Sequence, residues 1–406
     1  MLEYVDVAVL AAALAAASYF ALKARSRRGI LVVTGVSLAY FGFYRMGCVC
    51  PVGATQNCVL ALGQGAYAVS LGVAAMFLLP LVFTLLFGRT FCSGVCPLGA
   101  VQDLVLIHPL RLPRWLSRGL GMLPYVYLAA AVLLAFTGSA FLICRYDPFV
   151  TVFRLVPLGK WIQQGLQGSP AGAWWQDAAR TDLLVLTGAA LVASMFIGRP
   201  YCRFVCPYAV LLRACSRLSK WHVTITPDEC VQCRLCEDSC PFDAIEKPTP
   251  PASASRRTAG RGALAAVLAI SPVLIAAGAA AGFYAGGALA RTDYAVRFAG
   301  QIAAERAGQA PPGLPGEALH KAARPPEQVY AEADALGGRF RLGGALAGAF
   351  VGLAGAAKLV VLSIRRTRKD YLPNRAECVS CGRCLAYCPI ERRRRGLPPA
   401  GGSQIA

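Results

Sequence analysis

Charged residues are scarce in this chain: Asp, Glu, Lys and Arg make up 15% of its 406 residues, whereas 56% are hydrophobic. A soluble domain carries about 25% charged residues, so this shortage favours a membrane protein. The charges that are present sum to +20. The basic residues cluster at the ends of apolar runs, as the positive-inside rule expects of cytoplasmic loops, and this argues against nucleic acid as the partner.

Histidine is also scarce, with only His108, His222 and His320 in the whole chain. A bis-histidine haem pair inside the bilayer is therefore not expected. The sequence has no G-x-G-x-x-G, no Walker motif and no Ser/His/Asp arrangement, which argues against nucleotide-binding and hydrolase classes. Cysteine, by contrast, occurs 17 times. The odd count and the close C-x2-C and C-x3-C spacings favour metal ligation over a secreted disulfide framework.

The apolar residues form long runs, and a helix needs about 20 of them to cross the hydrocarbon core. We expect a mainly α, polytopic transmembrane bundle of about seven spans in the bacterial cytoplasmic membrane. The expected spans are 5–22, 29–45, 67–87, 122–143, 182–198, 263–289 and 343–364. Basic residues after the first run, and in alternate loops after it, place the N-terminus outside and the C-terminus in the cytoplasm.

The spans and the cysteine motifs suggest a division of the chain. The expected parts are a transmembrane bundle with C-x3-CP motifs (1–222), a ferredoxin-type half (223–248), a linker (249–262), a transmembrane hairpin (263–364) with an extracytoplasmic loop (290–342), a second ferredoxin-type half (365–392), and a basic, flexible tail (393–406).

Two cysteine runs share one pattern, C-x2-C-x2-C-x3-C-P. They comprise Cys230, Cys233, Cys236 and Cys240, and Cys378, Cys381, Cys384 and Cys388. This is the run of bacterial ferredoxins, which binds [4Fe–4S] clusters through thiolates. Structural zinc sites use separated pairs of cysteines instead. The sequence therefore predicts two [4Fe–4S] clusters.

The predicted hairpin separates the two runs, but the expected topology returns both to the cytoplasmic face. In two-cluster ferredoxins the fourth cysteine of each run ligates the other cluster. We therefore favour a crossed arrangement, in which Cys388 completes the first cluster and Cys240 the second. The alternative, in which each run binds its own cluster with all four cysteines, stays open.

A second pattern occurs twice, at the cytoplasmic ends of two predicted spans. Gly88-Arg89 leads into Cys92-x3-Cys96-Pro97, and Gly198-Arg199 leads into Cys202-x3-Cys206-Pro207. In a helix, C-x3-C places both sulfurs on one face. These four cysteines are candidates for a third metal or cluster site or for two redox dithiols. Packed structural cysteines are the alternative.

A third group, Cys48, Cys50, Cys58 and Cys144, is expected on the outer side. The stretch from Cys50-Pro51 to Gln56 echoes the stretch from Cys96-Pro97 to Gln102. The outer compartment permits disulfides, so a disulfide arrangement and a redox or metal site both remain open.

These motifs together resemble the NosR/NapH-type membrane polyferredoxins. The resemblance covers roughly residues 29–245 and is carried by the segments Phe91–Ala100 and Tyr201–Pro207 and by the ferredoxin run that follows them. It implies a membrane electron-transfer or maturation factor that serves periplasmic reductases. Larger members carry an extracytoplasmic flavin-binding domain, for which this sequence shows no motif, and compact members keep their ferredoxin runs adjacent.

The expected function is electron transfer between a cytoplasmic or quinone donor and a membrane or periplasmic redox partner. The alternative is a reductase or assembly factor that works on a metal or a thiol at the C-x3-CP sites during maturation of a metalloenzyme. The expected partners are the lipid bilayer, a redox protein and, as a further candidate, a quinone.

Overall fold

A computed structural model describes residues 2–45, 50–65, 67–148, 152–153, 181–225, 230–249, 254–309, 325–364 and 367–398. These residues are mainly helical, as expected, with only two short strands among them. The main helices of the first part are α1 (Leu2–Leu22), α2 (Arg27–Ser37), the π-helix η1 (Leu38–Tyr44), α3 (Pro51–Gly63), α4 (Leu71–Phe87), α5 (Thr90–Gly94), α6 (Pro97–Leu104), α7 (Arg114–Leu120), α8 (Leu123–Thr137) and α9 (Leu142–Tyr146).

The second part continues with α13 (Thr181–Phe196), α14 (Pro200–Phe204), α15 (Tyr208–Arg217), α16 (Leu235–Asp238), β1 (Ile245–Glu246), α17 (Ala254–Ala290), α18 (Tyr294–Arg306), α20 (Pro326–Ser363), β2 (Leu372–Pro373), α21 (Arg383–Tyr387) and α22 (Pro389–Arg394). Helix α18 lies in the predicted outer loop. The first turns of α17 lie in the predicted linker, where alanine and arginine favour a helix.

Four helical stretches among the described residues are long and apolar enough to cross a membrane. They are Glu3–Leu22, Arg114–Thr137, Gly260–Ala290 and Pro326–Ser363. The expected spans 67–87 and 182–198 correspond to the shorter apolar helices Leu71–Phe87 and Leu184–Phe196, and the expected span 29–45 is divided between α2 and η1. Four of the seven expected spans thus have a full-length counterpart, and the other three remain predictions.

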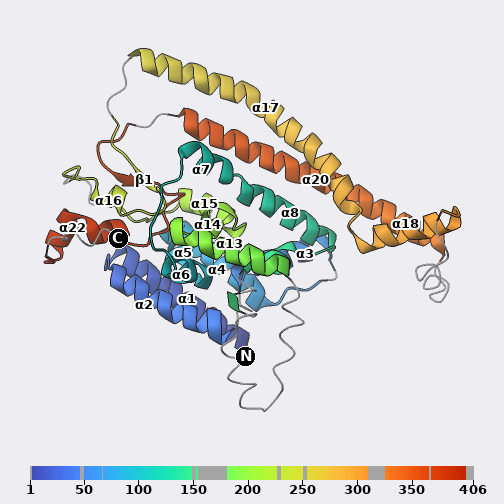
Figure 1. Ribbon diagram of the computed structural model, residues 1–406, viewed down its shortest axis with the longest axis horizontal. Coiled ribbons are helices and arrows are strands. Elements are labelled where there is room, and N and C mark those ends of the chain that lie inside the picture. Colours follow the sequence, from blue (N-terminus) through green and yellow to red (C-terminus); the bar gives the residue numbers. More distant parts are fainter. Residues whose placement is uncertain are drawn as a thin grey trace.

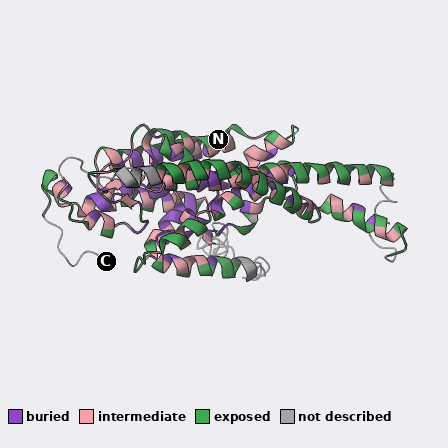
Figure 2. Ribbon diagram, turned by 90° about the horizontal axis from the view of Figure 1, so that it is seen from above, coloured by how far each residue is buried: buried purple, intermediate pink, exposed green. Residues whose placement is uncertain are grey.

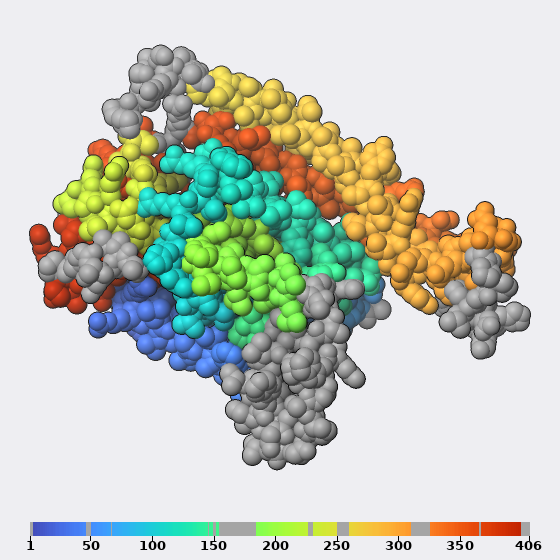
Figure 3. All heavy atoms as spheres, viewed as in Figure 1, coloured from blue at the N-terminus to red at the C-terminus, as the bar shows by residue number. Residues whose placement is uncertain are grey.

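Helices α17 and α20 form a long antiparallel hairpin that extends past the rest of the bundle (Figures 1 and 3). Glycines line their contact: Gly278, Gly282 and Gly286 on α17 face Gly344, Gly348 and Gly352 on α20. A Cβ atom at Gly282 would overlap the carbonyl oxygen of Gly344, and one at Gly348 would overlap that of Gly278. Small residues at this spacing allow the close backbone approach typical of transmembrane helix pairs.

The outward surface of the hairpin is apolar. Figure 2 shows its helices as mostly exposed, and Val273 and Leu346 each keep 65% of their surface accessible. An exposed apolar surface of this length is expected where lipid replaces water as the solvent. The hairpin therefore has the surface of a membrane element.

The two ferredoxin-type segments lie together at one end of the bundle, and α18 lies at the opposite end (Figure 1). Strand β1 pairs antiparallel with β2, with Ile245 opposite Pro373 and Glu246 opposite Leu372. The Asn374 side chain donates to Glu246 Oε1 at 2.8 Å, and its backbone N–H donates to the Ala244 carbonyl at 2.7 Å. The chain thus leaves this end through α17 and returns through α20 to pair with itself.

Candidate functional site

The two ferredoxin-type runs have the same backbone geometry around their second cysteine. Gln232 and Ser380 precede that cysteine with φ angles of 53° and 60°, and Arg234 and Gly382 follow it with 66° and 71°. Each run then enters a short helix, α16 or α21. Left-handed residues in such turns direct successive N–H groups inward and make an anion-binding concavity. The backbone N–H of Ser380 accordingly donates to Cys378 Sγ at 3.4 Å.

One cavity joins the two runs. Its lining includes Cys230, Cys233 and Cys236 of the first run and Cys388 of the second, and its empty volume is about 350 Å³. Tyr371, Ile225 and Ile390 complete much of the wall. The cavity thus brings together the four cysteines that the crossed arrangement assigns to one cluster.

The other four cysteines form a second group. Burial, together with the neighbouring Cys381 and Cys240, raises the pKa of Cys378 to about 12. Burial followed by the charge of Cys381 likewise raises the pKa of Cys240 to about 11. Cys384 is buried and interacts with Cys378, Cys381 and Cys240. Cys240 therefore lies among the cysteines of the other run.

The chemistry of these thiols fits a bound metal. Burial also raises the pKa of Cys236 to about 12, so a proton stays on this sulfur at neutral pH unless a cation displaces it. Among the described residues, no three Cys, His, Asp or Glu side chains lie close enough to hold a single metal ion. A [4Fe–4S] cluster holds its thiolate ligands further apart than a single metal ion does, so this spacing is compatible with cluster binding.

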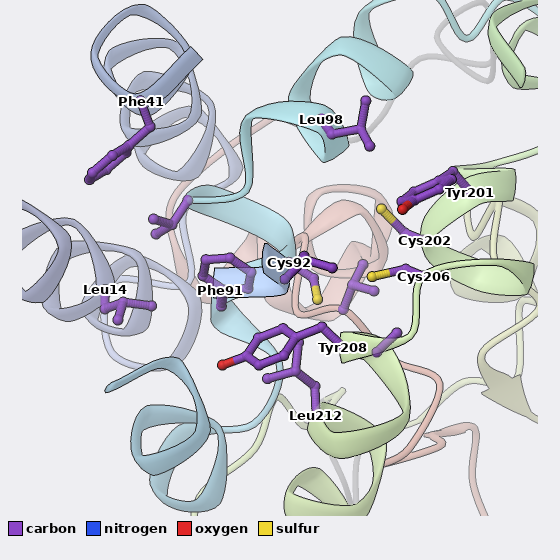
Figure 4. Packing of buried hydrophobic residues seen from close by; sticks show 14 of the residues in the cluster. Leu14, Phe41, Phe91, Cys92, Leu98, Tyr201, Cys202, Cys206, Tyr208 and Leu212 are labelled. Atoms are coloured by element: carbon purple, nitrogen blue, oxygen red, sulfur yellow. The ribbon is translucent and has the colours of Figure 1, made fainter. Parts of the chain in front are cut away.

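The C-x3-CP cysteines converge in the core of the bundle. In Figure 4, Cys202 and Cys206 point toward Cys92 on α5, between Tyr201 and Tyr208. Cys92, Cys202 and Cys206 are buried. Cys96 completes the group, since its side chain forms a hydrogen bond with that of Cys202. This bond, with Arg199 and Gln102, lowers the pKa of Cys202 to about 7 in spite of burial. We call Cys92, Cys96, Cys202 and Cys206 the inner quartet.

Two buried arginines lie next to the inner quartet. The cysteine motifs alone do not identify them as part of the site. Arg89 is 2% exposed and donates to Cys92 Sγ at 3.6 Å. Arg199 is 1% exposed, donates to the Cys92 carbonyl and pairs with Asp103 at 2.5 Å. A buried cation needs an anionic partner. Arg199 has Asp103, whereas Arg89 has the Cys92 sulfur and the charge of Glu377, so Arg89 favours a thiolate at Cys92. The repeated Gly-Arg before each C-x3-C was the signal for them.

The inner quartet abuts the ferredoxin-type segments directly. Arg89 donates to the Ala376 carbonyl at 3.1 Å, two residues before Cys378. A Cβ atom built on Gly198 would lie 2.6 Å from the Pro241 carbonyl oxygen, beside Cys240. Ser216 Oγ donates to the Arg375 carbonyl at 2.5 Å. One hydrophobic core includes residues from both parts, so no spacer separates the two groups of thiols.

Of the outer cysteines, the structure brings two together. A Cβ atom at Gly53, three residues after Cys50, would lie 3.5 Å from Cys144 Sγ. Cys58 lies eight residues beyond Cys50, about 12 Å further along α3 at the helical rise, and is not brought to them. Cys50 and Cys58 are free thiols, and Cys48 lies outside the described residues.

Known protein families match the same segments. Residues 69–122 and 180–226 match one family of 4Fe-4S binding domains, and residues 223–246 match a second. YccM of Escherichia coli is 28% identical over 202 residues, which are 47% of this chain and 52% of YccM. The regulatory protein NosR of Pseudomonas aeruginosa is 30% identical over 242 residues, 55% of this chain and 30% of NosR. NirI of Paracoccus denitrificans is 27% identical over 173 residues, 40% of this chain and 22% of NirI.

The chain thus spans about half the length of YccM and less than a third of NosR. No solved structure matches it. The helical fold, the apolar helices and the 4Fe-4S domains define an iron–sulfur protein of the membrane. Within that class, the similarity to NosR, NirI and YccM and the 4Fe-4S domains support a NosR/NapH-type membrane polyferredoxin.

Proposed function

We propose that this protein is a membrane-bound electron carrier with two [4Fe–4S] clusters, which exchanges electrons with a cytoplasmic or quinone partner on one side and a membrane or periplasmic redox partner on the other. The observation that carries the proposal is the crossed grouping of the two cysteine runs next to the inner quartet. The name of one relative agrees with a redox role, since YccM is named a putative electron transport protein, whereas NosR is named a regulatory protein.

The ligands of the first cluster are Cys230, Cys233, Cys236 and Cys388. The cavity that these four cysteines share supports this assignment, as does the pairing of β1 with β2, which holds the two halves in register. The ligands of the second cluster are Cys378, Cys381, Cys384 and Cys240, supported by the mutual electrostatic interactions of these thiols. The two halves then form one ferredoxin-like unit that the α17–α20 hairpin divides in sequence.

When bound, each cluster accepts and donates single electrons at a potential that its surroundings set. The protein residues control those surroundings. Burial excludes water from Cys236 and Cys384, and the left-handed turns direct backbone N–H groups toward the sulfurs. Arg89 and Arg199 stabilise negative charge between the ferredoxin-like unit and the inner quartet. The inner quartet is a third redox site, as a metal centre or a pair of dithiols.

The ferredoxin-like unit faces the cytoplasm and the N-terminus lies outside. This orientation is supported by the basic residues that gather at the unit's end of the bundle, such as Arg25, which pairs with Glu391 at 2.8 Å, and Arg368, which pairs with Glu246. Helix α18, at the opposite end, then lies on the outer side.

Redox-titrated EPR spectroscopy of the purified full chain tests the proposal. We expect two cubane-type signals, one lost in Cys233→Ser and the other in Cys381→Ser. Cys215→Ser is the matched control, because Cys215 lies on α15 outside all the groups described. Protein that binds zinc and no iron, or variants that keep both signals, would refute the proposal.

A second function, thiol or metal reduction during maturation of a metalloenzyme, is favoured by one observation: the pKa of Cys202 is lowered to about 7 by Cys96, Arg199 and Gln102. A thiol with this pKa is partly thiolate at neutral pH and can act as a nucleophile. If Cys202→Ser abolishes maturation of a partner enzyme while both cluster signals and their reduction by quinol persist, this function replaces electron transfer as the main role.

A further inference from the structure

The structure repeats one local arrangement at two places in the bundle. Helix α3 begins directly after Cys50 and α6 directly after Cys96. In both, the cysteine is the extended N-cap residue and proline occupies the first turn, where its missing N–H is not needed. A buried glutamine follows six residues after each cysteine, Gln56 in α3 and Gln102 in α6.

The two glutamines bind equivalent partners. Gln102 Oε1 accepts from the backbone N–H of Tyr201 at 3.1 Å, the residue before Cys202. Gln56 Oε1 accepts from the N–H of Ile143 at 3.0 Å, the residue before Cys144, and from Cys144 itself at 3.3 Å. Cys144 is therefore held against α3 as Cys202 is held against α6.

The correspondence extends to the end of the second helix. Helix α14 is followed by Cys206-Pro207, and α9 is followed by Asp147-Pro148. The N–H of Cys206 donates to the Tyr201 carbonyl at 2.8 Å, and the N–H of Asp147 donates to the Ile143 carbonyl at 2.9 Å. Asp147, which is 3% exposed, thus follows its helix as Cys206 does, but it lies three residues after Cys144 whereas Cys206 lies four residues after Cys202.

The three acidic groups of this second arrangement lie close to one another. Cys144 Sγ lies beside Gly53 in the first turn of α3. Burial, together with the neighbouring Asp147 and Cys144, raises the pKa of Cys50 to about 12. Asp147 is buried, Cys50 is partly buried and Cys144 is exposed. Thiolates and a carboxylate that are neighbours in this way repel when ionised, unless bound metal compensates their charge.

An unsatisfied donor also points to a ligand. Gln102 Nε2 donates to Cys202 Sγ at 3.5 Å, but Gln56 Nε2 is buried and has no hydrogen-bond partner among the described residues. A buried amide donor without a partner costs about 1–3 kcal/mol. A sulfide or a metal-bound thiolate at Cys50 and Cys144 would supply the acceptor that the Cys202 sulfur supplies in the inner quartet.

We propose that Cys50, Cys144 and Asp147 ligate a redox-active centre of the iron–sulfur class, built by an internal repeat of the arrangement that forms the inner quartet. Gln56 is a positioning residue that orients the Cys144 backbone and donates to the bound sulfur. Cys58 takes no part in it. The role of this centre as an electron carrier rests on the proposed electron-transfer function. Its binding of metal does not depend on that function.

The two arrangements are neighbours within the bundle. One cavity of about 340 Å³ is lined by Cys50 and Pro51 of one and by Cys96 and Pro97 of the other, with Phe41 and Met76 among its apolar walls. Tyr201 interacts electrostatically with both Cys206 and Asp147. An electron at the inner quartet would therefore reach the second centre without crossing an aqueous gap.

The test is the content of iron and acid-labile sulfide per chain, with EPR spectra, in full-length protein purified without oxygen. We expect Cys50→Ala/Cys144→Ala to lose iron and sulfide that Cys58→Ala and Cys215→Ala retain, with both ferredoxin signals unchanged. Asp147→Asn conserves shape, so a folded Asp147→Asn protein should keep the ferredoxin signals and lose or shift only the additional one. Gln56→Glu and Gln56→Leu both remove the amide N–H that donates to the bound sulfur, so both should shift that signal.

Equal iron and sulfide in Cys50→Ala/Cys144→Ala, Cys58→Ala and Cys215→Ala would overturn the proposal, as would a Cys50–Cys144 disulfide found by mass spectrometry of the protein as isolated. The variant Cys233→Ser separates this outcome from failure of the proposed function. If that variant keeps its full iron content, the ferredoxin assignment fails, and the Cys50→Ala/Cys144→Ala result still decides the second centre.

Discussion

The ferredoxin-like unit and the α17–α20 hairpin meet in the same chain, yet different interactions hold them. The unit depends on particular side chains: left-handed turns at Gln232 and Ser380, a strand pair and ion pairs between its halves. The hairpin depends on the absence of side chains, since glycines on both helices allow the backbones to touch. We infer from this difference that the hairpin determines where the second ferredoxin-type half lies, and that the side chains of the unit determine which group it binds.

The largest expected effect tests how the halves share their ligands. Under the crossed arrangement, Cys388→Ser should remove the same EPR signal as Cys233→Ser and leave the signal that Cys381→Ser removes. Cys240→Ser should show the opposite pattern. The physical reason is that Cys388 lines the cavity of the first run and Cys240 lies among the thiols of the second. If Cys388→Ser instead matches Cys381→Ser, each run binds its own cluster.

The next effect tests the hairpin. Gly282→Leu and Gly348→Leu place a side chain where the opposite backbone now lies, so we expect each to separate α17 from α20. Overpacking costs about 1–3 kcal/mol even where side chains can move, and a backbone clash should exceed that. The measurement is the thermal unfolding midpoint in detergent, with iron content recorded in parallel. Gly262→Leu is the control, because nothing lies within 4 Å of its Cβ position.

If the hairpin fixes the return of the second half, iron content should fall together with the unfolding midpoint in both variants. If iron is retained at full occupancy in a protein whose hairpin has opened, the contacts within the unit suffice by themselves. That outcome would contradict the view that the hairpin fixes the return of the second half.

The sequence predicted more of the unit than of its surroundings. Eight cysteines at fixed spacing identify the ferredoxin-type halves, because cluster geometry dictates that spacing. The crossed grouping was only favoured, since sequence alone does not show that the Cys388 segment returns beside Cys230. The tertiary contacts that bring them together are the β1–β2 pair and the glycine hairpin, and neither has a signal in the cysteine pattern.

The buried arginines Arg89 and Arg199 show where the positive-inside rule fails to describe this chain. Basic residues at the ends of apolar runs were interpreted through the positive-inside rule, which concerns exposed loops. Arg89 and Arg199 occupy such positions but are turned inward onto the inner quartet. Only the three-dimensional packing distinguishes an arginine that faces the cytoplasm from one that stabilises a buried thiolate.

The third prediction therefore concerns Arg199. Its loss in Arg199→Met should leave Asp103 without its cation and destabilise the protein by about 3–5 kcal/mol, the usual effect of breaking a buried pair. It should also shift the midpoint potential of the inner quartet, since a nearby positive charge is lost. Arg203→Met, in the helix α14 that begins directly after Arg199, is the control, because its carboxylate partner Asp243 lies 3.5 Å away and is partly exposed. Equal effects of the two variants would contradict a special role for Arg199.

The smallest expected effect is a pH-dependent one at Asp103. Burial favours the neutral acid, but the Arg199 guanidinium outweighs it and holds the pKa of Asp103 below its usual range. A carboxylate with a lowered pKa stabilises the fold above the pKa of the unfolded chain, about 3.9, and this stability is lost as the pH falls through the folded value. Asp103→Asn should therefore lose about 1.5–3 kcal/mol at pH 7, the value of a hydrogen bond to a charged group. The difference in unfolding free energy between Asp103→Asn and the natural protein should shrink toward zero in acid. Unfolding measured between pH 7 and pH 3 checks this. A difference that is constant with pH would mean that the shape of Asp103, and not its charge, holds Arg199 in place.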